Sequence, residues 1–102
     1  MSLRWPARPS NSSAAVVNPL ELEIAAEKAS ALGRAGEKAE RCLAELRAAG
    51  RDSPQRAALL RDAADAVYAY FIQRELCGLR RHHQIIREYD IPNEVLARLG
   101  AW

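Results

Sequence analysis

The densest group of side chains that could do chemistry lies between residues 74 and 87. Glu75 and His82 supply a carboxylate and an imidazole, a combination that can bind a metal ion or transfer protons. In one straight helix these two residues stand two turns, about 10 Å, apart. That distance is too long for both to hold one ion unless the chain bends sharply. The whole group, which we call the Arg/His cluster, consists of Arg74, Glu75, Arg80, Arg81, His82, His83 and Arg87.

The sequence contains no established pattern of catalytic or metal-binding residues. Zinc sites on one helix use histidines four residues apart, and neither an HxxxH nor an HExxH motif is present. We therefore expect no enzyme activity, no cofactor and no metal site. On this interpretation Glu75 pairs with Lys28, and His82 lies near Glu21. A small metal- or ligand-binding bundle centred on Glu75 and His82 is one alternative.

The cations of the Arg/His cluster suggest a second alternative, a nucleic-acid-associated regulator that uses Arg74–Arg87. The formal net charge is +2, and Arg4 and Arg8 account for this excess because residues 19–102 carry equal numbers of basic and acidic side chains. DNA binding needs many phosphate-neutralising cations on one face. Nucleic acid is therefore the less favoured partner.

Length and composition indicate one small soluble domain. The chain has 102 residues, of which 49% are hydrophobic and 27% charged. It contains few of the β-branched and aromatic residues that a buried sheet needs. No apolar run approaches the ~20 residues of a membrane span, so we expect no membrane contact. The opening MSLRWPARPS lacks the apolar core of a secretory signal. With two isolated cysteines, Cys42 and Cys77, these features predict a cytoplasmic protein.

The first helix is predicted over 19–49. Asn18 can cap its N-terminus, Pro19 suits the first helical position, and Glu21 completes a capping box. Gly50 is a natural stop. An apolar stripe with a period of 3.5 residues, typical of a packed helix seam, consists of Leu22, Ala25, Ala29, Leu32, Gly36, Ala39, Leu43 and Leu46.

Two further helices complete the predicted all-α fold. The second is expected over 54–89. It should end there because Ile91 precedes Pro92, and a residue before proline disfavours the helical backbone conformation. The third and shorter helix is expected over 92–99. Residues 1–17 are expected to be a flexible N-terminal arm, and residues 18–102 a single helical domain.

The short link between the first two helices predicts a long antiparallel hairpin. If the turn centres near residues 51 and 52, facing residues have numbers that sum to about 103. This register places Tyr70 beside Gly33. The opposite-charge pairs that it predicts are Asp62 with Arg41, Asp65 with Lys38, Glu75 with Lys28, and Arg80 with Glu23.

Helices of about 46 and 54 Å are too long for a compact monomer of this size. A bare hairpin cannot bury the wide apolar sector of the second helix. One solution is that two chains pair into a dimeric four-helix bundle. The other is that the helices break at Gly33–Gly36 and Cys77–Gly78 and fold back within one chain. We expect the homodimer.

Three stretches resemble a small uncharacterised proteobacterial family of all-helical proteins, a domain of unknown function. They are Leu22–Gly36, Tyr68–Arg81 and Tyr89–Trp102. The resemblance implies a bacterial cytosolic helical protein and no site residues. Together with the residue patterns, it leads us to expect a non-catalytic interaction or scaffold module that acts as a homodimer, with another protein as a further candidate partner.

Overall fold

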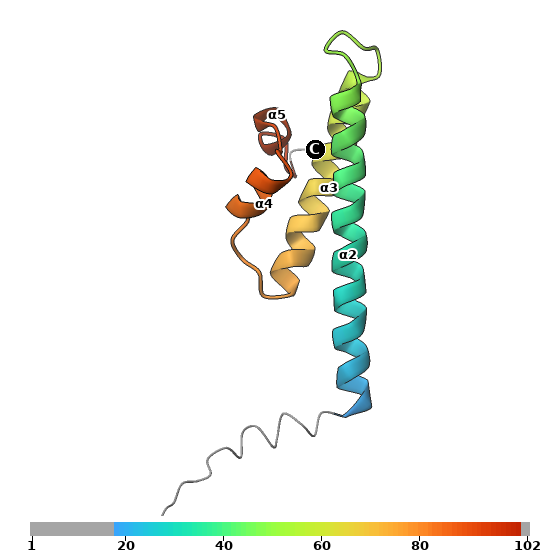
Figure 1. Cartoon of the computed structure of the whole chain (residues 1–102), viewed down its shortest axis with the longest axis vertical. Helices are drawn as coiled ribbons and strands as arrows, with labels where there is room; N and C mark the ends of the chain where they lie inside the picture. Colours follow the sequence, from blue (N-terminus) through green and yellow to red (C-terminus); the bar gives the residue numbers. More distant parts are fainter. Residues whose placement is uncertain (1–17, 101–102) are drawn as a thin grey trace, which may run out of the picture.

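The computed structural model describes residues 18–100, and these residues form helices without a β-strand. α2 (Pro19–Ala48) and α3 (Arg56–Leu76) pack side by side as the predicted antiparallel hairpin. After α3 the chain turns back, so that α4 (His83–Glu88) and α5 (Asn93–Leu96) lie beside the hairpin (Figure 1). None of the described helices is long and apolar enough to cross a membrane. The predicted N-terminal arm lies outside the described residues.

α2 begins at the predicted capping residue. The Asn18 side-chain oxygen accepts a hydrogen bond of 2.8 Å from the backbone N–H of Glu21, and Pro19 occupies the first helical turn. The helix continues to Ala48, one residue before the predicted end, and does not break at Gly33–Gly36. The second half of its apolar stripe is buried, at Gly36, Ala39, Leu43 and Leu46.

The prediction of one continuous second helix over 54–89 is wrong, because α3 ends at the alternative break point. The N–H of Leu79 donates to the carbonyl oxygen of Arg74 at 2.8 Å, and the N–H of Gly78 donates to that of Glu75 at 3.0 Å. These two bonds form a Schellman motif, which needs a left-handed residue after the helix. Gly78 provides it with a φ of +87°.

The segment after this turn covers part of the hairpin from within the same chain. α5 is shorter than the predicted 92–99 helix, and it packs against α3. Ile91 and Val95 are 6% and 0% exposed, so part of the apolar sector of α3 is buried without a second chain. Partly buried side chains around this core include Ile85, Ile86, Tyr89, Leu96 and Leu99.

The helix register differs from the predicted one by about a helical turn. The ring of Tyr70 faces Gly36 instead of Gly33, and a Cβ atom on Gly36 would lie 3.2 Å from Tyr70 Cε1. A side chain at this position would press against the ring, so glycine favours the close approach of the two helices at this level. Of the predicted pairs, that of Arg80 with Glu23 is wrong, because α3 ends before Arg80.

The difference in length between the two long helices leaves part of α2 without a neighbour. The Sγ atom of Cys77, just after α3, is 3.9 Å from the carbonyl oxygen of Lys28. Residues 19–28 therefore project past the end of α3 (Figure 1), and all of them are exposed. We call this segment the α2 overhang.

The Gly78→Ala substitution should lower the free energy of unfolding by about 1–2 kcal/mol, the cost of a left-handed conformation for an L-residue. Gly33→Ala is the matched control. Gly33 lies inside α2, and a Cβ atom added there would meet nothing within 4 Å, so alanine should raise stability by about 0.5–1 kcal/mol. Urea denaturation of both variants measures the contrast. Equal effects of the two substitutions would contradict this role of Gly78.

Candidate functional site

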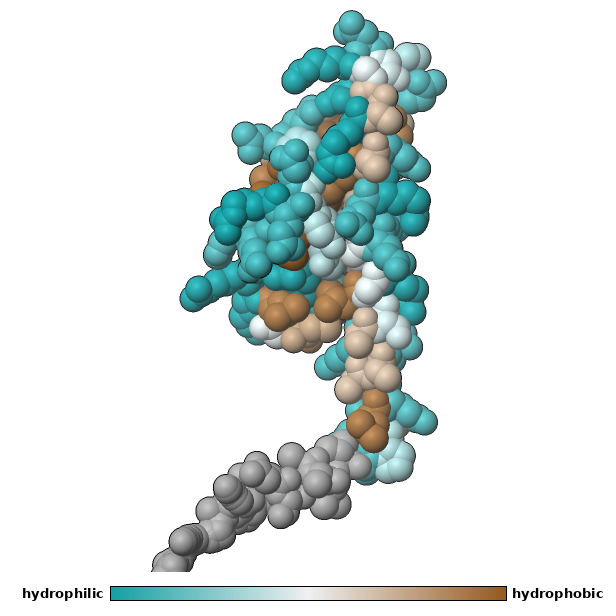
Figure 2. Space-filling model, in the orientation of Figure 1, coloured by the Kyte–Doolittle hydropathy of each residue, from teal (hydrophilic) through white to brown (hydrophobic). Residues whose placement is uncertain are grey.

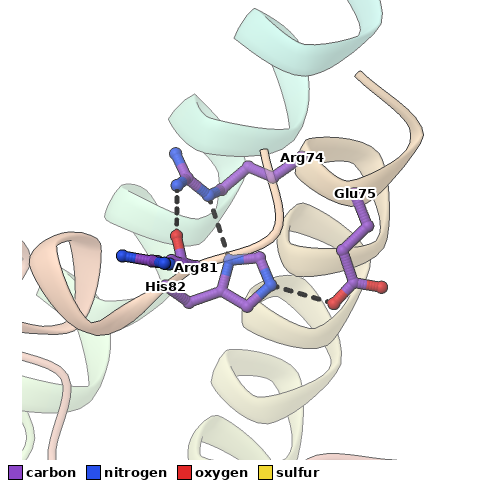
Figure 3. A network of polar contacts seen from close by, with 4 residues as sticks. All are labelled: Arg74, Glu75, Arg81 and His82. Atoms are coloured by element: carbon purple, nitrogen blue, oxygen red, sulfur yellow. Dashed lines mark hydrogen bonds and ion pairs between the residues drawn. The ribbon is translucent and has the colours of Figure 1, made fainter. Parts of the chain in front are cut away.

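The turn after α3 brings Glu75 and His82 together. Because Gly78 reverses the chain, His82 lies against the last turns of α3 (Figure 3). The Nε2 atom of His82 is 2.9 Å from Oε2 of Glu75. The bend thus closes the gap of about 10 Å that a straight helix would leave between these two residues.

A second contact of His82 determines where its imidazole carries hydrogen. The Nε–H of Arg74 donates to Nδ1 of His82 at 3.1 Å. A guanidinium group has no acceptor atom, so Nδ1 must accept and cannot itself carry a hydrogen. In the neutral ring the hydrogen is then on Nε2, which donates to the carboxylate of Glu75.

The remaining contacts of this network hold the turn against α3. The rings of Phe71 and His82 stack with centroids 4.2 Å apart and planes within 5°. Arg74 also donates from Nη2 to the carbonyl oxygen of Arg81 at 2.7 Å, and its guanidinium lies 5.9 Å from the ring centre of Tyr70. These contacts hold the α3–α4 connection in place. They also bury most of the His82 side chain, which is only 14% exposed.

These partners differ from those that the sequence predicted. Glu75 contacts His82, and His82 contacts Arg74, in place of the expected contacts with Lys28 and Glu21. Within residues 18–100, no group of three or more His, Cys, Asp or Glu side chains is placed to hold a metal ion. The network therefore supplies one carboxylate and one imidazole, but no third side chain of these types beside them among the described residues.

The other members of the Arg/His cluster lie around the same turn. The structure brings Arg74, Glu75 and His82 into one network, which Arg81 joins through its backbone carbonyl. The remaining cationic and imidazole side chains stay exposed, and they are those of Arg80, Arg81, His83 and Arg87.

A second cluster of interacting side chains, which was not predicted from the sequence, is centred on Tyr89. Its ring stacks on that of Tyr70, with centroids 5.7 Å apart and planes within 11°. Nη2 of Arg47 donates to the carbonyl oxygen of Tyr89 at 2.6 Å. A hydrogen bond with Tyr70 and burial raise the pKa of the Tyr89 hydroxyl above its ordinary value of 10.0. A groove of about 380 Å³ beside this group is lined by Glu40, Leu43, Ala44, Arg47, Glu88, Tyr89 and Asp90.

The two cysteines do not form a reactive pair. Cys42 is buried in the core, and this burial, together with nearby Glu45 and Asp62, raises the pKa of its thiol. A raised thiol pKa lowers the thiolate fraction that nucleophilic chemistry requires. Cys77 is half-buried at the end of α3.

The most exposed of the large apolar side chains lie on the α2 overhang and at the end of α3. Figure 2 shows hydrophobic side chains at both places. Leu22 is 60% exposed and Leu76 is 63% exposed. Between the two helices is a groove of about 360 Å³, lined by Ala25, Lys28, Ala29, Leu32, Leu76 and Cys77. We call Leu22, Ala25, Ala29, Leu32 and Leu76 the apolar strip.

A protein-family model matches residues 3–102, almost the whole sequence. The chain belongs to a family of unknown function, DUF6665. Membership in DUF6665 confirms the resemblance to a family without an assigned function, while a proteobacterial origin stays a prediction. The search of curated proteins and the search of solved structures found no match. Membership in DUF6665 assigns no activity and no site residue, so functional proposals depend on the geometry.

Replacement of His82 by alanine should lower the free energy of unfolding by about 1–3 kcal/mol, because it leaves the half-buried Arg74 without one acceptor and removes the stacked ring. His83→Ala is the control, since His83 is exposed and its loss should change stability by no more than about 0.5 kcal/mol. Chemical denaturation gives both values. Nitrogen NMR of His82 in its neutral form should show hydrogen on Nε2, and a ring with hydrogen on Nδ1 would contradict the network.

Stability should fall as the pH rises above 10.0, the ordinary pKa of tyrosine. Because the folded state holds the Tyr89 proton more tightly, the unfolded chain loses its proton first and ionisation favours unfolding. The stabilisation is complete below that pH and is lost above it. Urea midpoints measured across this range should decline less steeply in Tyr89→Phe. An identical decline in the variant would show that another group is responsible.

Proposed function

We propose that this chain is a non-catalytic helical interaction module that acts as a homodimer in the bacterial cytoplasm. The observation that supports this proposal most strongly is the apolar strip, of which all residues but the half-buried Leu32 are exposed. Contiguous exposed apolar patches on soluble proteins commonly mark interaction sites. Here the strip continues, in the same repeat, the stripe that is buried farther along α2 at Gly36 and Leu43.

The α2 overhang itself favours a binding partner. All residues of the helix segment 19–28 are exposed, and short helices with little tertiary packing are marginally stable in water. The capping bond between Asn18 and the Glu21 N–H stabilises its first turn. Docking of a partner on the apolar strip would add the packing that α3 gives to the rest of α2.

The form of the proposed dimer differs from the predicted four-helix bundle. That bundle was expected because a second helix over 54–89 would expose a wide apolar sector. α4 and α5 cover part of this sector within one chain. The large apolar surface that stays open is concentrated at the α2 overhang and the end of α3, so we place the dimer contact there.

A nucleic-acid-associated regulator remains the second candidate, and the exposed side chains of Arg80, Arg81, His83 and Arg87 favour it. Arg74, however, is engaged by His82 and the Arg81 carbonyl. The exposed cations at the turn are therefore fewer than the sequence count implies. Retention on DNA that weakens steeply with salt would support this candidate.

Light scattering on a sizing column tests the homodimer. As the protein concentration is raised, the mass should approach twice 11.3 kDa, and the dimer should persist when the salt concentration is raised, because apolar contact depends little on screening. A mass that stays at one chain throughout the accessible concentration range would contradict the proposal.

A further inference from the structure

We propose that the exposed end of the apolar strip, Leu22 and Ala25, is covered by the α2 overhang of a second copy of this chain, packed in antiparallel orientation. This inference rests on the proposed function, because it names the surface through which the homodimer forms. In this arrangement the second overhang takes the place that α3 would occupy if it continued past Leu76. Three features of the described residues favour this occupant over an unrelated protein.

The first feature is length. The α2 overhang, residues 19–28, is the part of α2 that α3 leaves uncovered. If two overhangs overlap fully, the start of the second helix comes level with Lys28. It then meets the end of α3, where Cys77 contacts the Lys28 carbonyl. A second copy thus supplies a helix of the required length, running in the direction of α3.

The second feature is that the overhang is complementary to itself. In the fully overlapped antiparallel register, Leu22 of each chain faces Ala25 of the other, so a large side chain meets a small one. Glu21 of each chain then lies beside Lys28 of the other, because these residues flank the strip on one side. The two-fold symmetry repeats both contacts, as an isologous interface requires.

The third feature is the charge on either side of the contact. The overhang has three acidic residues, Glu21, Glu23 and Glu27, and one basic residue, Lys28. Its N-terminal end would lie beside the turn after α3, where Arg80 and Arg81 are exposed. The acidic end of each helix therefore meets the basic turn of the other chain. This arrangement gives the exposed half of the Arg/His cluster a partner.

The size of the contact sets the strength of the association. Stable interfaces use about 20–30 residues on each side, and the overhang with the end of α3 provides fewer. The dimer should therefore dissociate on dilution. A mass that changes with concentration is the behaviour expected of this interface.

Two matched substitutions test which face of α2 is used. Leu22 and Ile24 are both exposed, at 60% and 49%, and they stand on opposite sides of the helix because two residues span about 200°. Leu22→Glu should raise the dissociation constant at least tenfold, whereas Ile24→Glu should change it less than about twofold. Circular dichroism of both variants checks that the helix content is kept.

Two charge reversals test the orientation. Lys28→Glu places acids side by side at both symmetric contacts, and Glu21→Lys does the same with cations, so each variant alone should dimerise several-fold more weakly. In a mixture of the two variants, each heterodimer contains two opposite-charge pairs. Association should therefore recover in the mixture, as measured by sedimentation equilibrium.

The outcomes separate this inference from the proposed function. A wild-type dimer that tolerates Leu22→Glu and shows no recovery in the mixture overturns the overhang contact but leaves the homodimer standing. A wild-type monomer in which Leu22→Glu lowers the stability would show that another part of the same chain covers the strip. That result, or a monomer unaffected by the substitution, overturns both proposals.

Discussion

The left-handed backbone at Gly78 is the constraint on which the rest of the structure depends. Because the chain reverses there, α3 ends beside Lys28 of α2, and the following residues return along the hairpin. The same reversal places His82 on Phe71 and leaves the α2 overhang without a neighbour. The polar network and the apolar strip are thus two consequences of one turn, which holds the fold-back in place and leaves a surface open.

Features decided by neighbouring residues could be predicted from the sequence. Asn18 caps α2 because its side chain reaches an N–H three residues away. The end of α3 is harder to predict, because apolar residues recur at helical spacing on both sides of Gly78. That pattern indicates a continuous helix, and only the glycine itself indicates a break. The register was misplaced because it was derived from surface charge pairs, which contribute little. In the structure the Tyr70 ring lies over Gly36, within the packed core between the two helices.

The residues of the candidate site were predicted more successfully than their contacts. Glu75 and His82 were singled out by residue type, but their direct contact requires a bend that the predicted straight helix lacked. The stacking of Tyr70 on Tyr89 requires the whole fold-back, so no local pattern indicates it. The overhang is a difference between two helix lengths, and it becomes visible only when both ends are known.

The contacts that fasten the fold-back also bear on the order in which the chain folds. Arg47 and Tyr89 are 42 residues apart in the sequence, and Arg56 and Glu94 are 38 apart. Closing such long loops costs more entropy than forming the α2–α3 hairpin across its short link. We expect the hairpin to form first and the C-terminal segment to dock later. A chain caught between these two steps exposes the whole open face of its hairpin, so slow docking would favour misassembly with other unfinished chains.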